Sequence, residues 1–302
     1  MRRLIALFAA TFVSVAGAEL ALRFHEGSTI FPTDGRGYAT RPGTRGTNWR
    51  GFLERDAVPP GAIAVLGDSM TWGTTTAEEA WPRVAEGILG RPVSNYSHYG
   101  YDGAKEAATL RAHVWQDAPA MIVYAAYSND LVPTRLITVG EPPTLAWIGP
   151  ATALGRAIFG IWHGRTYREA EEPAAFSAAL SDMRAQAAAH DVPFLVFALA
   201  PYSLDVLDPL GPLGPLGPLD RLRVIEGLCA QVPYASVVPY LRGNPGAYAS
   251  ANTADREHPG PRGQALFAAA FADVLARFEA GAALPRVDDP PIALGPPIEL
   301  GR

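Results

Sequence analysis

The chain has 302 residues, 48% of them apolar, and a formal net charge of −5 at pH 7. This composition can build a sizeable core, and the length suits one α/β domain with flanking segments. No basic patch is interleaved with aromatic residues, so nothing indicates a nucleic acid as a partner. The single cysteine, Cys229, excludes an internal disulfide and a cysteine metal cluster, and we expect it to be a small buried residue in a helix.

Residues 1–24 have the pattern of a signal for export. Arg2 and Arg3 precede an apolar stretch over residues 4–18, which one glutamate separates from a further apolar turn. We favour an uncleaved signal-anchor, because the stretch comes close to the length of a membrane-spanning helix. A cleaved signal peptide stays open, because Ala-Gly-Ala at residues 16–18 suits a cleavage site. Both keep Arg2 and Arg3 inside and place the rest of the chain in the periplasm or cell envelope, or outside the cell; a cytoplasmic buried helix is least favoured.

Residues 25–60 are rich in Gly, Pro, Thr and Arg without a sustained period, which indicates a linker or an irregular wrap. From residue 61 onward, short apolar runs alternate with helical patterns. Strands are expected at 62–66, 93–95, 121–126, 192–198 and 236–239, and helices at 78–90, 103–116, 174–189 and after residue 258. This alternation predicts an α/β domain over residues 61–280, with a doubly wound parallel sheet and right-handed crossovers. In the first helix, Trp81, Val84, Ile88 and Leu89 are expected to face the core.

Three segments have no place in this alternation. Residues 131–172 carry aromatic and aliphatic side chains and form either a wall or lid over a cleft or a helical hairpin at the domain edge. Residues 209–219 repeat a Pro-Leu-Gly triplet, which is typical of an extended polyproline-like loop. Residues 281–302 are a Pro-rich tail, and we expect the part after Pro285 to be poorly ordered.

A candidate nucleophile follows the first strand. The apolar run over residues 62–66 ends abruptly in Gly67, Asp68 and Ser69. Glycine allows a sharp turn, and the turn leaves the serine at the carboxyl end of the strand, where open α/β sheets place reactive groups. A serine hydroxyl attacks a carbonyl only if a nearby base accepts its proton.

A candidate base lies near the C-terminus, where Asp255 and His258 precede a helical pattern. An imidazole can accept the serine proton, and a carboxylate on its other nitrogen would fix the tautomer and stabilise the imidazolium. Taken alone, this short motif is more often an ordinary helix start, with Asp255 as a cap.

Two further positions could stabilise negative charge on a carbonyl oxygen. Gly100 can bring a bare backbone N–H close to a substrate, and Asn129 ends the third strand. With the backbone N–H of Ser69 they would form an oxyanion hole. Taken singly, Gly100 is an ordinary turn glycine and Asn129 an Asx-turn. His98 either lines the same cleft or lies in a surface turn.

The four motifs together, in this order and strand context, resemble the SGNH hydrolases, also called the GDSL esterase/lipase superfamily, over residues 60–280. The resemblance implies a flavodoxin-like three-layer sandwich with a five-stranded sheet. The residues that it assigns are a triad of Ser69, His258 and Asp255, an oxyanion hole from Ser69, Gly100 and Asn129, and supporting roles for Asp68 and Asp130. Two positions depart from the family pattern: Met70, a mild change, and Tyr127, which replaces a glycine and is expected to narrow the cleft.

The resemblance implies a serine esterase that acts on O-acyl esters, acetyl esters among them, of envelope carbohydrate or lipid. It implies no cofactor and no metal, and the N-terminal segment would supply contact with the membrane. Two alternatives stay open. One is an O-acyltransferase in which a sugar hydroxyl replaces water. The other is a non-catalytic envelope assembly protein with the same fold, against which the intact Ser69, Asp255 and His258 argue.

Overall fold

The computed structural model describes part of the chain. The described residues are 11, 14–18, 30–31, 39–40, 47–72, 76–131, 172–200, 217–244 and 258–294. Most of the N-terminal segment, residues 132–171, most of the Pro-Leu-Gly repeat and Asp255 lie outside them, so the expectations for these parts are not tested. Within the described residues, no helix combines the length and the apolar character needed to cross a bilayer.

Five parallel strands form the central sheet, in the spatial order β4-β3-β5-β6-β7. They are β3 (Ile63–Gly67), β4 (Val93–Asn95), β5 (Met121–Ala125), β6 (Phe194–Ala198) and β7 (Tyr234–Ser236). All their residues are buried, as expected for parallel strands that helices cover on both faces. Counted along the chain, this is the flavodoxin-like order 2-1-3-4-5. The predicted doubly wound α/β fold with five strands is therefore confirmed.

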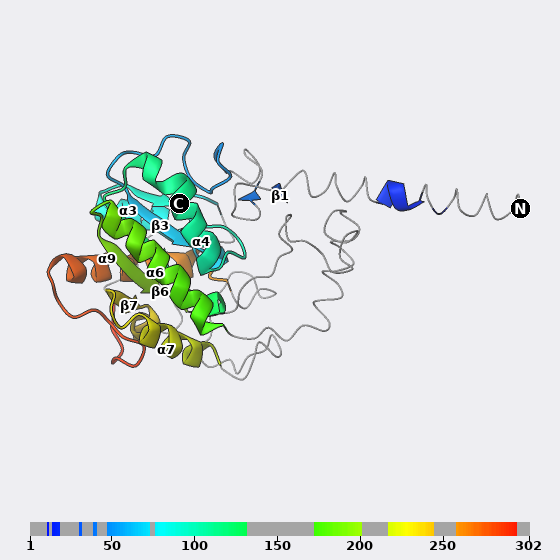
Figure 1. Ribbon diagram of the computed structural model, residues 1–302. Coiled ribbons are helices and arrows are strands. Elements are labelled where there is room, and N and C mark those ends of the chain that lie inside the picture. The colour runs from blue at the N-terminus through cyan, green and yellow to red at the C-terminus, as the bar shows by residue number, and fades with distance from the viewer. Residues whose placement is uncertain are drawn as a thin grey trace, which may run out of the picture.

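Helices cover both faces of the sheet (Figure 1). On one face α3 (Trp81–Leu89) packs against α9 (Pro261–Glu279). On the other face α4 (Gly103–Thr109) packs against α6 (Pro173–Ala189), which also contacts α7 (Pro218–Leu228). Proline stands in the first turn of α3, α6, α7 and α9. Backbone N–H groups in a first turn have no acceptor within the helix, so proline loses no hydrogen bond there, and its fixed φ suits the helix. The described residues also include a short antiparallel pair, β1 (Ile30–Phe31) and β2 (Ala39–Thr40).

The last strand lies two residues earlier than the sequence predicts. A strand over 236–239 is wrong, because β7 ends at Ser236 and α8 (Val238–Gly243) begins at Val238. The two valines and the proline at residues 237–239 suggest an edge strand, but Pro239 is equally suited to the first turn of a helix. The Ser236 hydroxyl accepts the N–H of Val238 at 3.2 Å and stabilises this turn.

Two other local expectations need correction. The single helix expected over 103–116 is α4 followed by a π-helical turn, η1 (Leu110–Val114), and a 3₁₀ turn, η2 (Trp115–Asp117). In α3, Trp81 is fully buried and Val84 and Leu89 pack against the core, but Ile88 is 37% exposed.

The Pro-rich tail is packed on the domain as far as residue 294, so the expectation of poor order is wrong for residues 286–294. Val287 is 1% exposed, and its N–H donates to Glu226 at 2.9 Å. The N–H of Ser236 donates to the carbonyl of Pro285 at 2.8 Å, so the tail covers the edge of β7. The N–H of Ile292 donates to Pro239 at 2.9 Å.

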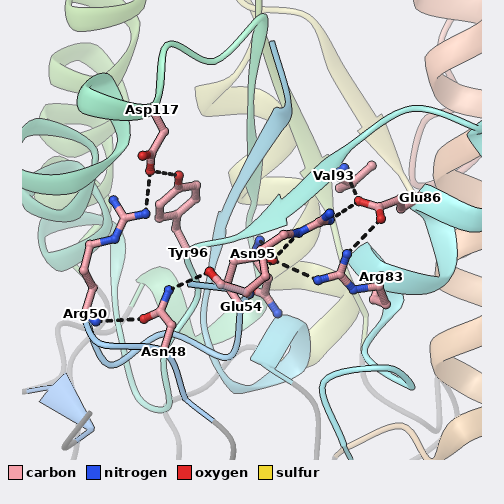
Figure 2. Close-up of polar contacts among 10 residues, drawn as sticks. Asn48, Arg50, Glu54, Arg83, Glu86, Val93, Asn95, Tyr96 and Asp117 are labelled. Atoms are coloured by element: carbon pink, nitrogen blue, oxygen red, sulfur yellow. Dashed lines mark hydrogen bonds and ion pairs between the residues drawn. The ribbon is translucent and has the colours of Figure 1, made fainter. Parts of the chain in front are cut away.

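Residues 47–56, here called the strap, belong to the expected linker but are bonded into the domain (Figure 2). The side chain of Phe52 is fully buried between the rings of Tyr96 and His113, with centroid distances of 5.4 and 5.5 Å. Arg50 forms an ion pair with Asp117 at 2.6 Å and donates to the carbonyl of His113 in the π-helical turn. The strap is therefore the irregular wrap that the composition indicates.

Glu54 connects the strap to β4 and α3. Its side chain is 2% exposed and accepts the N–H of Asn95 at 2.6 Å and that of Arg55 at 2.7 Å. The same carboxylate contacts the guanidinium groups of Arg83 at 2.9 Å and Arg55 at 3.1 Å, and both arginines also pair with Glu86. Figure 2 shows this series of contacts between the strap and β4.

Candidate active site

The candidate nucleophile follows directly from the end of β3. Helix α2 (Ser69–Trp72) begins at Ser69, and the Oδ1 atom of Asp68 accepts the N–H of Met70 at 2.9 Å. Gly67 is required in this turn, because a Cβ atom there would lie 2.5 Å from the Oγ1 atom of Thr71. Ser69 thus stands at the carboxyl edge of the sheet, beside the β3/β5 boundary where the strand order reverses. Open α/β sheets bind their ligands at such a switch point.

The structure brings the candidate base to the nucleophile. The Nε2 atom of His258 lies 2.8 Å from the Oγ atom of Ser69, although 189 positions separate them. His258 lies just before α9, and Gln264 in the first turns of that helix is fully buried. The side chain of Gln264 accepts the N–H of Trp81 at 2.8 Å and donates to the carbonyl of Met70 at 3.3 Å. Gln264 therefore fixes α9, and with it the approach of His258, to the helix that starts with the nucleophile.

The candidate oxyanion amide lies at the end of the neighbouring strand. Asn129 is in the 3₁₀ turn η3 (Ser128–Leu131) after β5, and its Nδ2 atom donates to the Oδ2 atom of Asp68 at 2.8 Å. Asp68 therefore links the nucleophile turn to the amide. An amide nitrogen carries two hydrogens, so the bond to Asp68 leaves one N–H of Asn129 for a substrate oxygen.

The loop after β4 contributes Gly100 and a group of aromatic rings. Gly100 has φ +64°, which favours glycine. The N–H of His98 donates to Gly67 at 3.0 Å, so the loop runs beside the end of β3. His98 is 2% exposed, stacks on Tyr101 with a centroid distance of 4.7 Å and lies edge-on to Trp72 at 5.0 Å, so a surface turn is wrong. Next to it, the ring of Tyr99 meets the ring of His258 edge-on at 6.3 Å.

Asp130 stabilises the turn that carries Asn129. Its Oδ2 atom accepts the hydroxyl of Tyr124 at 2.9 Å and the N–H of Tyr127 at 2.8 Å, which closes the turn at the end of β5. Burial raises the pKa of Asp130 well above its ordinary value of 3.8, and the nearby charge of Asp68 adds to this effect. The ring of Tyr127, expected to narrow the cleft, is 3% exposed and belongs to the hydrophobic core.

Three site-related residues are absent from the expectations: Glu106, Gln264 and Tyr99. Glu106 has a weak local signal, because it follows the N-cap Asp102 by four positions and precedes the buried Leu110, the first residue of η1, by four. Gln264 has none, because its partners are 183 and 194 positions away. Tyr99 has a local signal, because it directly precedes Gly100. Asp255 is outside the described residues, so its place beside His258 stays a prediction, as does the role of Gly100 as a donor.

No protein-family model and no curated protein sequence matches the chain. Among solved structures, the chain is similar to a GDSL-like lipase from Bacteroides thetaiotaomicron, with 13% identity, a TM-score of 0.43, and coverage of 72% of this chain and 88% of the other. It is similar to the psychrotrophic esterase EstA from Pseudoalteromonas sp., with 12% identity, a TM-score of 0.47, and coverage of 73% and 99%. A third is a carbohydrate esterase family 2 enzyme with a carbohydrate binding domain from Corynascus thermopiles (Myceliophthora fergusii), with 13% identity, a TM-score of 0.46, and coverage of 75% and 68%. At these identities and TM-scores, a functional assignment depends on the residues of this chain and not on the likeness.

Proposed function

We propose that this protein is a serine esterase of the SGNH type. The observation that carries the proposal is the 2.8 Å contact between the Ser69 hydroxyl and His258, at the switch point of a parallel sheet. A serine and an imidazole at this distance form a nucleophile and its general base. Asn129, held by Asp68 at the end of the adjacent strand, supports the proposal because acyl transfer needs donors for the developing oxyanion.

In the proposed reaction, His258 takes the proton of Ser69 as the hydroxyl oxygen attacks the ester carbonyl. Negative charge forms on the carbonyl oxygen, where the free N–H of Asn129 and the backbone N–H groups of Ser69 and Gly100 stabilise it. His258 then gives the proton to the leaving alcohol, and an acyl-enzyme remains on Ser69. Water, activated by His258, releases the acid in the second half of the reaction. Asp255 orients the imidazole and stabilises its charged form.

The proposed substrates are O-acyl esters, acetyl esters among them, on carbohydrate or lipid of the cell envelope. Support comes from the sequence: residues 1–24 have the pattern of a signal-anchor or signal peptide, and the motifs resemble an esterase family. The protein would then act in the periplasm or envelope, with a membrane contact through the N-terminal segment and without nucleic acid. Transfer of the acyl group to a sugar hydroxyl would use the same residues, and only the acceptor in the second half differs.

A fluorophosphonate label and a series of p-nitrophenyl esters test the proposal. Ser69→Ala should abolish both labelling and ester hydrolysis while the circular dichroism spectrum stays unchanged, because the attacking oxygen is gone. Ser181→Ala, at an exposed position on α6, is the matched control and should keep both. Undiminished turnover in purified Ser69→Ala would contradict the assignment. Adding a sugar acceptor separates the two outcomes, since a transferase yields acylated sugar in place of free acid.

A further inference from the structure

Four carboxyl groups lie buried behind the candidate oxyanion amide, and we call them the acid cluster. Its members are Asp68, Asp102, Glu106 and Asp130, none of them more than 5% exposed. They come from the end of β3, the start of α4 and the turn after β5, and they lie near enough for their charges to interact. Four negative charges in one buried site would repel each other strongly, so the cluster must hold some of its carboxyls in the protonated form.

Two members have the partners of ionised carboxylates. Asp102 forms an ion pair with the ammonium of Lys105 at 2.6 Å and caps α4. Asp68 accepts one N–H on each oxygen, from Met70 at 2.9 Å and from Asn129 at 2.8 Å. Both sets of contacts stabilise the charged form.

The other two members have oxygens that lack a donor. Among the described residues, neither oxygen of Glu106 nor the Oδ1 atom of Asp130 has a hydrogen-bond partner. Burial raises the pKa of Glu106 well above its ordinary value of 4.5, and the charges of Asp130, Asp68 and Asp102 raise it further. The nearby Tyr124 hydroxyl lowers it by less. Burial and mutual repulsion therefore disfavour charge on both carboxyls at once, and one neutral carboxyl supplies the missing donor, an O–H.

We propose that Glu106 and Asp130 share one proton and form a buried acid pair that positions Asn129. The O–H of one carboxyl donates to an open oxygen of the other, which satisfies the Oδ1 atom of Asp130 and one oxygen of Glu106. Asp130 keeps its Oδ2 atom for Tyr124 and Tyr127 and so holds the turn that carries Asn129. Glu106 is then a positioning residue, because it acts on the oxyanion amide through Asp130.

The pair also has an electrostatic consequence. Ester hydrolysis builds negative charge on the substrate oxygen beside Asn129, and further anions behind the amide would oppose it. With one proton shared between Glu106 and Asp130, fewer negative charges stand behind Asn129, and the carboxylate of Asp68 is the one bonded to its amide. Within the described residues the carboxyls are not arranged in a group that could hold a metal ion.

Infrared difference spectroscopy of the full chain at neutral pH tests the shared proton directly. The wild-type spectrum minus that of Glu106→Gln should show the carbonyl band of a protonated carboxylic acid, because a glutamine amide donates to Asp130 and leaves it ionised. Asp130→Asn should remove the same band. Thr109→Ala, at a buried position one turn further along α4, is the control and should keep it. A difference spectrum with carboxylate bands alone would overturn the acid pair.

Kinetics with p-nitrophenyl acetate test the positioning role, which rests on the proposed esterase function. Glu106→Ala should lower kcat about tenfold with KM unchanged, because a displaced Asn129 loses contact with transition-state charge. Glu106→Gln should restore kcat to within about threefold, since an amide can replace the neutral acid. Thr109→Ala should change neither constant.

The outcomes separate this inference from the proposed function. A folded Glu106→Ala variant with full kcat, or with a loss confined to KM, would overturn the positioning role. If Glu106→Ala fails to fold, the spectrum and kcat of Glu106→Gln decide, and a loss of kcat in Glu106→Gln as large as in Asn129→Ala would overturn the proposal. Because the infrared measurement needs no turnover, the acid pair can be verified even if Ser69→Ala refutes the esterase.

Discussion

Replacing Glu54 by glutamine should lower the free energy of unfolding by about 2–4 kcal/mol. The side chain is 2% exposed, and its carboxylate accepts the buried N–H of Asn95 at 2.6 Å. A glutamine that keeps its carbonyl toward the arginines turns its NH₂ group toward Asn95, so two donors face each other. An unsatisfied buried N–H costs about 1–3 kcal/mol.

The lost charge adds a smaller amount. Arg83 and Arg55 are 27% and 30% exposed and both keep Glu86 as a partner, so the weakened ion pairs contribute only about 0–1 kcal/mol each. The opposite amide orientation is worse, because the NH₂ group would then face three donors. The expected loss is a large share of a total stability of about 5–15 kcal/mol.

Urea unfolding of the full chain, followed by far-ultraviolet circular dichroism, measures this loss. The matched control is Glu78→Gln, an exposed glutamate between the strap and α3, which should change the stability by less than about 0.5 kcal/mol. The dependence on urea should stay the same in both variants, because the folded surface does not change. A loss below about 1 kcal/mol in Glu54→Gln would show that the strap is not bonded to β4 in solution.

Three further outcomes follow from the site. Asn129→Ala should lower kcat roughly 100- to 1000-fold with little change in KM for p-nitrophenyl acetate, and a rise in KM at constant kcat would make it a ground-state contact. Because the pKa of folded Glu106 lies above its ordinary 4.5, the folded state keeps its proton longer than the unfolded state and loses stability as the pH rises above that value. Urea unfolding at several pH values should show that Glu106→Gln removes this slope, up to about 1.4 kcal/mol per pH unit, and an equal slope in both proteins would contradict the pKa shift. Gln264→Ala should cost about 1–3 kcal/mol, because the N–H of Trp81 loses its acceptor, and should also lower kcat; unchanged stability and rate would refute its bridging role.

The central strands could be predicted because their signal is local. Strands of a parallel sheet are buried on both faces, so β3, β5 and β6 are continuous apolar runs in the sequence. Their order along the chain, with helices between them, then fixes the topology almost completely. The approach of His258 to Ser69 follows from this topology together with the motifs, since both lie at the carboxyl edge of the sheet.

The rest depends on contacts between distant positions. Nothing near Phe52 or Glu54 indicates burial, because their partners are Tyr96, His113 and Asn95, which lie far along the chain. A glutamate on a helix is ordinarily exposed, so the spacing of Glu106 from Asp102 and Leu110 is too weak a signal to predict its burial, which follows from the packing of α4 on the sheet.

The separation of Ser69 from His258 has a consequence for a newly made chain. Ribosomes add about 5–20 residues per second, so the base emerges roughly 10–40 s after the nucleophile, given the 189 positions between them. During that interval the serine lacks the imidazole of His258 as its proton acceptor, and Gln264 does not yet connect α9 to Trp81 and Met70. A nascent chain would therefore carry an inert serine. The proposed hydrolysis would begin only when the last helix docks, so ester turnover would report that folding is complete.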